Sequence, residues 1–319
     1  MIVVLGATFY LFLGLGAKTS LTNQLLSKQQ VLARAEAGNV TSFFQVFGDS
    51  VAVLSQLKTI TSSNSAIWSL DSFTEQWRDS GLVYGIALTD GSGVVRFNSN
   101  VSEVSEEISL SDRDYFLWAK GGPEAGEYFV GTPVISRLGT SKDQPVIPVA
   151  APVYQNGTFA GVLVAEVGLH PLTKHYLNLM KVTDSTDIFL ITKNGTLLYS
   201  NSFHSGIDVN LFDFLKTNSF SGSKALSDNL KNALNASGEG RLEISYSDSR
   251  TGRVESHAMA YSSIDLGGQQ WLLVMASPAQ DIWDLTIPLY IRLIVLMVLV
   301  AVTVFAFGII AVKEVQKRL

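Results

Sequence analysis

The chain has 319 residues, a formal net charge of −5 and no cysteine. Without cysteine it can form neither disulfides nor thiolate metal sites, and it has no thiol nucleophile. The segment from Lys313 onward carries +2, from three basic residues and one acidic residue, so the rest of the chain carries −7. This acidic balance argues against nucleic acid as a partner.

An apolar stretch near the C-terminus predicts a transmembrane helix over residues 288–312. Its core, residues 293–312, holds twenty residues without a charge. At a helical rise of about 1.5 Å per residue, that length crosses a hydrocarbon core of about 30 Å. Basic residues crowd its far end, at Lys313, Lys317 and Arg318. The positive-inside rule therefore places the tail at 313–319 in the cytoplasm.

A shorter apolar stretch opens the chain at residues 1–17. It has sixteen uncharged residues from Ile2 to Ala17, and no basic residue precedes them. A cleaved signal peptide needs a positively charged start. We therefore predict an uncleaved transmembrane helix whose cytoplasmic start is missing from the sequence. The intervening region then lies on the extracellular or periplasmic side of the plasma membrane, with lipid as a partner at both ends.

Helical periodicity continues beyond the first apolar stretch. Leucines at 21, 25 and 32 are followed by apolar residues at 43, 47, 51, 54 and 57, close to a 3.5-residue stripe. The pattern predicts a stalk helix over 18–63 that grows out of the membrane.

The remaining sequence predicts two α+β modules built on antiparallel sheets. Residues 64–170 open with a short helix and continue into apolar strand patterns, and residues 182–280 repeat the scheme after a connecting helix at 171–181. Hairpin turns are expected at Asp90-Gly91, Asn156-Gly157 and Asn194-Gly195. The openings ALTDGSGVVRFNS and LITKNGTLLYSN share one strand-turn-strand plan, which indicates a duplication.

These features together resemble the double Cache (tandem PAS-like) sensor domains of prokaryotic transmembrane receptors. The resemblance is carried by the stalk, by the segment from Asp112 to Phe116, by EYFVGTPVIS, by the strand pair PVIPVAAPVYQNGTFAGVLVAEVGL and by the opening of the second module. It implies that the membrane-distal module, 64–170, holds a small ligand, and that the proximal module, 182–280, passes strain to the second transmembrane helix. It also implies a homodimer packed along the stalks.

Arg113 is the centre of the expected ligand site. A guanidinium beside Tyr115 and Phe116 can grip a carboxylate bidentately while aromatic walls exclude water. The structural alternative is an ion pair of Arg113 with Asp112 or Asp114 among core aromatics. The resemblance favours the binding role. Further lining candidates are Phe129, Gly131, Ser136, Arg137, Tyr84 and Tyr154.

The chain departs from the amino-acid-binding members of this family. Those carry Arg-x-Trp-Tyr and a later Asp that pairs with the ligand ammonium group, whereas this chain has Arg113-Asp114-Tyr115-Phe116 and places Ser136, followed by Arg137, at the Asp position. Without that carboxylate an ammonium group loses its charge partner. A small carboxylate or another small metabolite is therefore expected in place of an amino acid.

No pattern predicts catalysis or a cofactor within these residues. His170 and His175 are five apart with Pro171 between them, so they do not form an i, i+4 metal pair. We therefore expect a sensing receptor whose signal reaches a cytoplasmic histidine kinase, diguanylate cyclase or chemotaxis-type output. The alternative is a ligand-free scaffold at the cell surface that binds another membrane protein.

Overall fold

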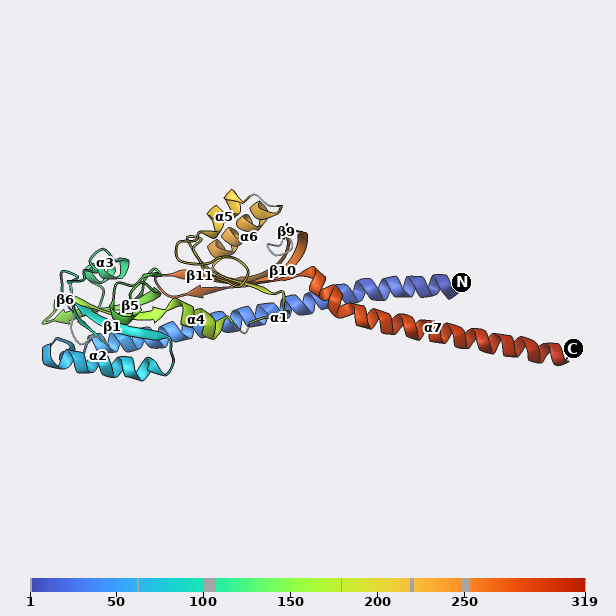
Figure 1. The fold of residues 1–319 in the computed structure, drawn as a ribbon, viewed down its shortest axis with the longest axis horizontal. Helices are drawn as coiled ribbons and strands as arrows, with labels where there is room; N and C mark the ends of the chain where they lie inside the picture. The colour runs from blue at the N-terminus through green and yellow to red at the C-terminus, as the bar shows by residue number, and fades with distance from the viewer. Residues whose placement is uncertain are drawn as a thin grey trace.

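One long helix, α1 (Ile2–Ser55), runs beside both sheets of the molecule, and both chain ends lie at the same end (Figure 1). The computed structural model describes residues 2–61, 63–99, 107–178, 180–218, 221–247 and 253–318. After α1 the chain makes a 3-10 turn, η1 (Lys58–Thr61), and returns along the stalk as α2 (Ser63–Arg78).

The distal module contains a six-stranded antiparallel sheet. Its strands are β1 (Val83–Thr89), β2 (Val95–Asn98), β3 (Phe129–Val130), β4 (Val134–Ile135), β5 (Pro145–Gln155) and β6 (Thr158–Gly168). The order is β2-β1-β6-β5-β3, with β4 also paired to β5. Helix α3 (Asp114–Lys120) and the 3-10 turn η2 (Gly139–Ser141) lie between strands, and α4 (Leu169–Tyr176) leads out of the module.

The proximal module contains a five-stranded antiparallel sheet in the order β8-β7-β11-β10-β9. Its strands are β7 (Asp187–Thr192), β8 (Leu197–Ser200), β9 (Glu239–Ser247), β10 (Val254–Asp265) and β11 (Gln270–Pro278). Helices α5 (Leu211–Thr217) and α6 (Ser223–Ala236) cover the face opposite the stalk. The last strand runs directly into α7 (Ala279–Arg318).

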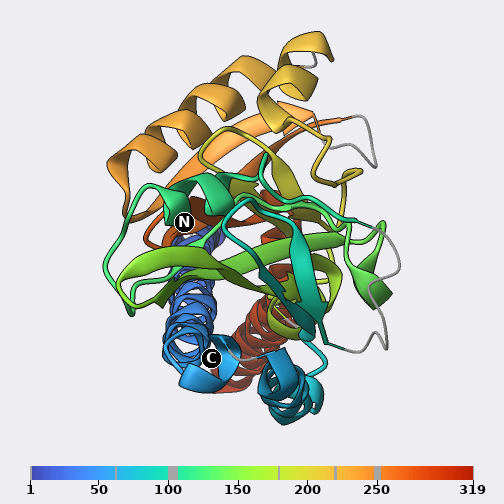
Figure 2. The same ribbon diagram turned by 90° about the vertical axis from the view of Figure 1, so that its left-hand side faces the viewer.

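Each sheet is buried on both faces, and α1 supplies one of the two covers. Alternate residues of the central strands point to opposite sides: Leu163 and Ala165 of β6 join the cluster that contains α1, whereas Val162 and Val164 join the cluster under α3. The view along the stalk shows the sheets between α1 and the outer helices (Figure 2). The outer face of the distal sheet, under α3, therefore packs against Tyr115, Phe116 and Phe129, three of the predicted site residues.

The expected α+β class is confirmed, with a long N-terminal helix followed by two antiparallel sheets. The stalk helix ends at Ser55, earlier than the sequence pattern suggested, and the Ser55 hydroxyl donates to the carbonyl oxygen of Ala52 at 2.8 Å. The helix that connects the modules is α4, which ends at Tyr176. Among the described residues, no helix is both long enough and apolar enough to cross a membrane.

Candidate functional site

Arg113 lies at the boundary where an extended segment turns into α3. Its backbone is extended (φ −81°, ψ 143°), and helix α3 starts at the next residue. The Asp114 carboxylate accepts hydrogen bonds from the backbone N–H of Tyr115 at 2.7 Å and of Thr132 at 2.8 Å. Asp114 thus joins the start of α3 to the loop after β3, and its carboxylate oxygens are occupied by backbone N–H donors.

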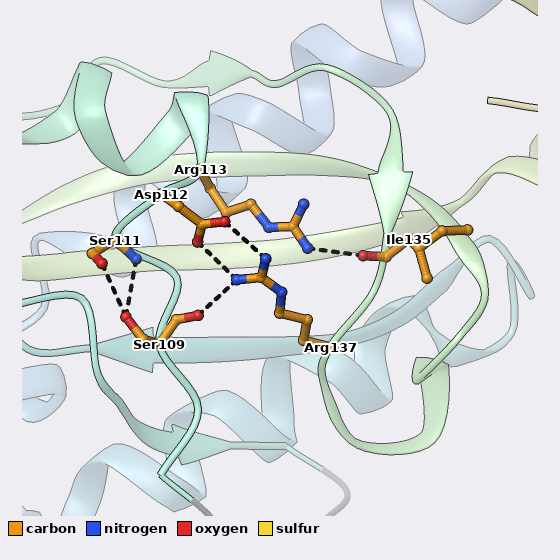
Figure 3. A network of polar contacts seen from close by, with 6 residues as sticks. All are labelled: Ser109, Ser111, Asp112, Arg113, Ile135 and Arg137. Atoms are coloured by element: carbon orange, nitrogen blue, oxygen red, sulfur yellow. Dashed lines mark hydrogen bonds and ion pairs between the residues drawn. The ribbon is translucent and has the colours of Figure 1, made fainter. Parts of the chain in front are cut away.

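The structure does not contain the ion pair that the sequence offered as an alternative role for Arg113. Asp112 pairs instead with Arg137, whose Nη1 and Nη2 donate to its two carboxylate oxygens at 2.7 and 2.8 Å (Figure 3). Arg137 Nη1 also donates to the carbonyl oxygen of Ser109 at 3.1 Å. Within the described part of the chain, Arg113 takes part in no ion pair.

The Arg113 guanidinium has a single hydrogen bond to the described residues, from Nη2 to the carbonyl oxygen of Ile135 at 3.0 Å (Figure 3). Its Nε atom is buried and has no hydrogen-bond partner among them. A buried charged donor without an acceptor is costly. Arg113 therefore retains hydrogen-bonding capacity that an added acceptor can satisfy.

In contrast to Arg113, the neighbouring residue Asp112 is held in an ion pair. The hydrogen bonds from Arg137 hold the pKa of Asp112 below its usual range, and Asp112 in turn raises the pKa of Arg137. Both side chains are about half exposed, at 44% for Arg137 and 56% for Asp112. The pair is charged at neutral pH and accessible to solvent.

A buried carboxylate, Glu166 of β6, lies behind the Arg113 site. It is 5% exposed, and one oxygen accepts from the Ser136 hydroxyl at 2.6 Å while the other accepts from the Ser141 hydroxyl. Burial raises the pKa of Glu166, although both hydroxyls and the charge of Arg113 act in the opposite direction. Glu166 therefore anchors the segment from β4 to η2.

Several predicted site residues do come together around this anchor. Ser136 is 3% exposed and its hydroxyl is engaged by Glu166, so it supports the site from behind. Gly131 lies so close to Tyr115 that an added Cβ would be 3.2 Å from the Cδ1 atom of the tyrosine ring. Tyr115 is buried, and this burial raises its pKa.

The predicted aromatic residues divide between two places. Phe116 contacts Phe159 edge to face at 6.1 Å, and Phe159 contacts Tyr154 in the same way at 6.2 Å. Tyr154 donates to the carbonyl oxygen of Pro123 at 2.6 Å. Phe116 and Phe159 thus belong to the core under α3, and Tyr154 contacts this core through Phe159.

Phe129 packs at the edge of the same core, and Tyr84 lies elsewhere in the distal module. The Phe129 ring stacks on Trp118 at 5.2 Å and approaches Gly268 in the turn between β10 and β11. It lines a groove of about 540 Å³ between the two modules. Tyr84 lies beside Gly168, where β6 leads into α4.

A family model described as a Cache domain, dCache_1, matches residues 17–284. The chain belongs to the Cache domain family. Comparison with curated protein sequences found no match.

Solved structures similar to this Cache chain include sensor domains of chemoreceptors. One is a structure titled Methyl-accepting Chemotaxis protein X, with a TM-score of 0.58 and 16% identity over 80% of this chain and 98% of that one. Another is the ligand-binding domain of a Campylobacter jejuni chemoreceptor in complex with 4-methylisoleucine, with a TM-score of 0.55 and 17% identity over 82% and 94%.

A third is the ligand-binding domain of a Pseudomonas fluorescens chemoreceptor in complex with L-alanine, with a TM-score of 0.55 and 12% identity over 80% of this chain and 97% of that one. At such low identities the likeness shows a shared fold.

Sequence reasoning missed Glu166 in the distal Cache module. The signal was present, because Glu166 is the one charged residue in the apolar run VLVAEVG of a strand that is buried on both faces. A charge in such a strand needs internal partners. What the sequence did not show is that these partners are Ser136 and Ser141, which precede it by 30 and 25 residues.

Replacing Glu166 with Gln tests the electrostatic cost of this buried group. Because the folded-state pKa is raised, the carboxyl group contributes stability that is fully present below the unfolded-state pKa and is lost as pH rises through the folded-state pKa. Glu166→Gln should therefore gain thermal stability relative to the wild type as pH rises from 4 to 8.

The measurement is the melting temperature of both full-length proteins at several pH values, with Glu243→Gln as the control at an exposed position of β9. A difference between Glu166→Gln and wild type that does not change with pH would contradict the assignment.

Proposed function

We propose that this chain is the sensing part of a transmembrane receptor that binds a small carboxylate in its distal Cache module through Arg113. The bound ligand biases the packing of the two modules on the stalk, and the change passes through α7 to a cytoplasmic output. Candidate outputs are a histidine kinase, a diguanylate cyclase or a chemotaxis-type signalling domain. The Cache family membership supports the sensing role.

The observation that carries the proposal is the state of Arg113. Its guanidinium is in no ion pair with the described residues, and its buried Nε–H lacks an acceptor. A carboxylate can satisfy Nε and a terminal nitrogen of the same guanidinium at once, and such bidentate pairs are stronger than neutral hydrogen bonds. The adjacent aromatic residues Tyr115 and Phe116 are buried and exclude water from this side of the site.

The ligand class follows from the acids around Arg113. Chemoreceptors of similar fold were solved with 4-methylisoleucine and L-alanine, whose ammonium groups need an anionic partner. Here Asp112 is paired with Arg137, Asp114 accepts backbone N–H groups, and both oxygens of Glu166 accept from serine hydroxyls. Because all three carboxyl groups already have partners within the protein, we expect a ligand that has a carboxylate and no amino group.

Polar contacts of the stalk offer a route for the signal. Gln29 of α1 donates to the Ser277 hydroxyl at 2.7 Å, and both residues are fully buried. Ser277 lies at the end of β11, one residue before the strand gives way to α7. A shift of α1 relative to the proximal sheet would therefore reach the start of α7. A ligand can drive such a shift only by binding the two packings unequally.

Replacing Arg113 tests the ligand assignment. Against a panel of acetate, propionate, pyruvate, lactate, succinate and malate, the full-length protein in detergent should show a thermal shift with at least one compound. Arg113→Ala should remove that shift and cost roughly 2–5 kcal/mol of binding free energy by calorimetry, because a charged hydrogen-bonding partner is lost. Arg113→Lys should retain part of the affinity, since it keeps the charge without the bidentate geometry.

Lys120→Ala provides the control, because it removes an exposed cation from the other end of α3. A carboxylate that binds Arg113→Ala as tightly as wild type, or a panel without any hit, would rule out the Arg113 assignment.

We also propose that residues 1–17 and 288–312 span the membrane, with the tail in the cytoplasm, and that two copies pack along their stalks. Support for the second span comes from the uncharged run at 293–312 and from its described apolar side chains, such as Leu296 (62% exposed) and Phe305 (72% exposed). Support for the stalk contact comes from Val31, Val46 and Val53, which are 60%, 58% and 62% exposed.

Single cysteines can test both points because the chain has none of its own. Asp228→Cys on α6 should react with an impermeant maleimide in intact spheroplasts, whereas Gln316→Cys should react only after lysis. Val46→Cys should form a crosslinked dimer under mild oxidation, and Asp228→Cys should not. Labelling of Gln316→Cys in intact spheroplasts would reverse the orientation, and failure of Val46→Cys to crosslink would contradict the stalk contact.

A further inference from the structure

Two arginines from different segments lie at the same site and differ in their hydrogen-bond acceptors. Arg113 precedes α3 and Arg137 follows β4, and their side chains lie near each other in Figure 3. Arg137 donates from both terminal nitrogens to the two oxygens of Asp112. That is the geometry in which an arginine binds a ligand carboxylate. Among the described residues, Arg113 donates to a single acceptor, the main-chain carbonyl oxygen of Ile135.

Asp112 therefore stands where a second ligand carboxylate would bind. Its contacts with Arg137 are direct, at 2.7 and 2.8 Å, and the pair is exposed enough for solvent or a ligand to reach it. The Ser109 carbonyl oxygen adds a third acceptor for Arg137, at 3.1 Å. Both terminal nitrogens of Arg137 therefore already donate to acceptors within the protein.

The other charged side chains near the two arginines are acidic, so they cannot pair with an additional ligand carboxylate. Asp114 is next to Arg113 in sequence and is held by backbone N–H groups. Glu166 faces the other side of the β4–η2 segment and is held by Ser136 and Ser141. The named groups thus comprise two cations and three acidic side chains. One ligand carboxylate has Arg113 as its partner, and a second has no unpaired cation among these groups.

We propose that Asp112 sets the charge selectivity of the Arg113 site, by occupying Arg137 and so restricting the site to ligands with one carboxylate. The inference rests on the proposed role of Arg113. A dicarboxylate would have to displace Asp112 from Arg137 or leave its second charge unpaired beside it, and either outcome disfavours binding. Without the Asp112 charge, Arg137 becomes a second anchor and the site accepts dicarboxylates.

Asp112→Asn tests this selectivity because it retains the shape of the side chain and removes its charge. Calorimetry on the full-length protein in detergent would compare acetate, propionate and pyruvate with succinate and malate. Wild type should bind its preferred monocarboxylate at least tenfold more tightly than either dicarboxylate. Asp112→Asn should bind a dicarboxylate at least tenfold more tightly than wild type does, and this gain should exceed any gain in its monocarboxylate affinity at least threefold.

Two further variants make the test specific. Asp143→Asn makes the same charge change at an exposed residue after η2, where the backbone has a positive φ of 67° that asparagine also tolerates. It should keep the wild-type preference. Adding Arg137→Ala to Asp112→Asn should remove the gain in dicarboxylate affinity. Melting temperatures of all variants establish that they are folded.

The outcomes separate this inference from the proposed function. If Arg113→Ala abolishes monocarboxylate binding but Asp112→Asn keeps the wild-type preference, the selectivity role is wrong and the Arg113 role stands. If wild type already binds a dicarboxylate most tightly, the selectivity role is also wrong. If neither wild type nor Asp112→Asn binds any carboxylate, both ideas are overturned.

Discussion

The fold depends on one helix that serves two sheets. The buried face of α1 covers the stalk-side face of both sheets. Without α1, that face of each sheet would be exposed to water. Two neighbouring phenylalanines show the division: Phe44 contacts Trp271 of the proximal sheet edge to face at 5.9 Å, and Phe47 contacts Trp77 of α2 at 4.8 Å. One buried face of α1 thus packs against both modules at once.

The site is organised by three consecutive residues, the last residue of β4 and the two that follow it. The carbonyl oxygen of Ile135 accepts from Arg113, the hydroxyl of Ser136 binds Glu166 inside the module, and the side chain of Arg137 pairs with Asp112 on the outside. Extended backbone directs successive side chains to opposite faces. One short segment can thus join the buried anchor to the exposed ion pair, and its position determines where both arginines lie.

Much of the architecture could be predicted from the sequence because it depends on local pattern. The stripe of apolar residues predicted the stalk helix, and the Asn156-Gly157 turn lies between β5 and β6, where the residue at 156 has a positive φ of 52°. The family resemblance pointed to Arg113.

Partner choice within the site could not be predicted in the same way. Asp112 and Asp114 flank Arg113, yet Asp112 pairs with Arg137, 25 residues away, and Asp114 accepts from backbone donors. The ring of Phe129, a predicted lining residue, packs against the core under α3 and also approaches Gly268 of the other module. Such pairings depend on how segments that are distant in the sequence meet across the sheet. A local sequence pattern does not predict these contacts.

The most direct test of the account is to observe the Arg113 Nε–H during ligand binding. In protein labelled with ¹⁵N at arginine Nε, the signal that Arg113→Lys removes can be followed as a bound monocarboxylate is titrated. The account predicts that this signal moves downfield and that its exchange with water slows, because a buried donor gains a charged acceptor. Saturable binding that leaves the Arg113 signal unchanged, or that shifts the Arg137 signal instead, would contradict it.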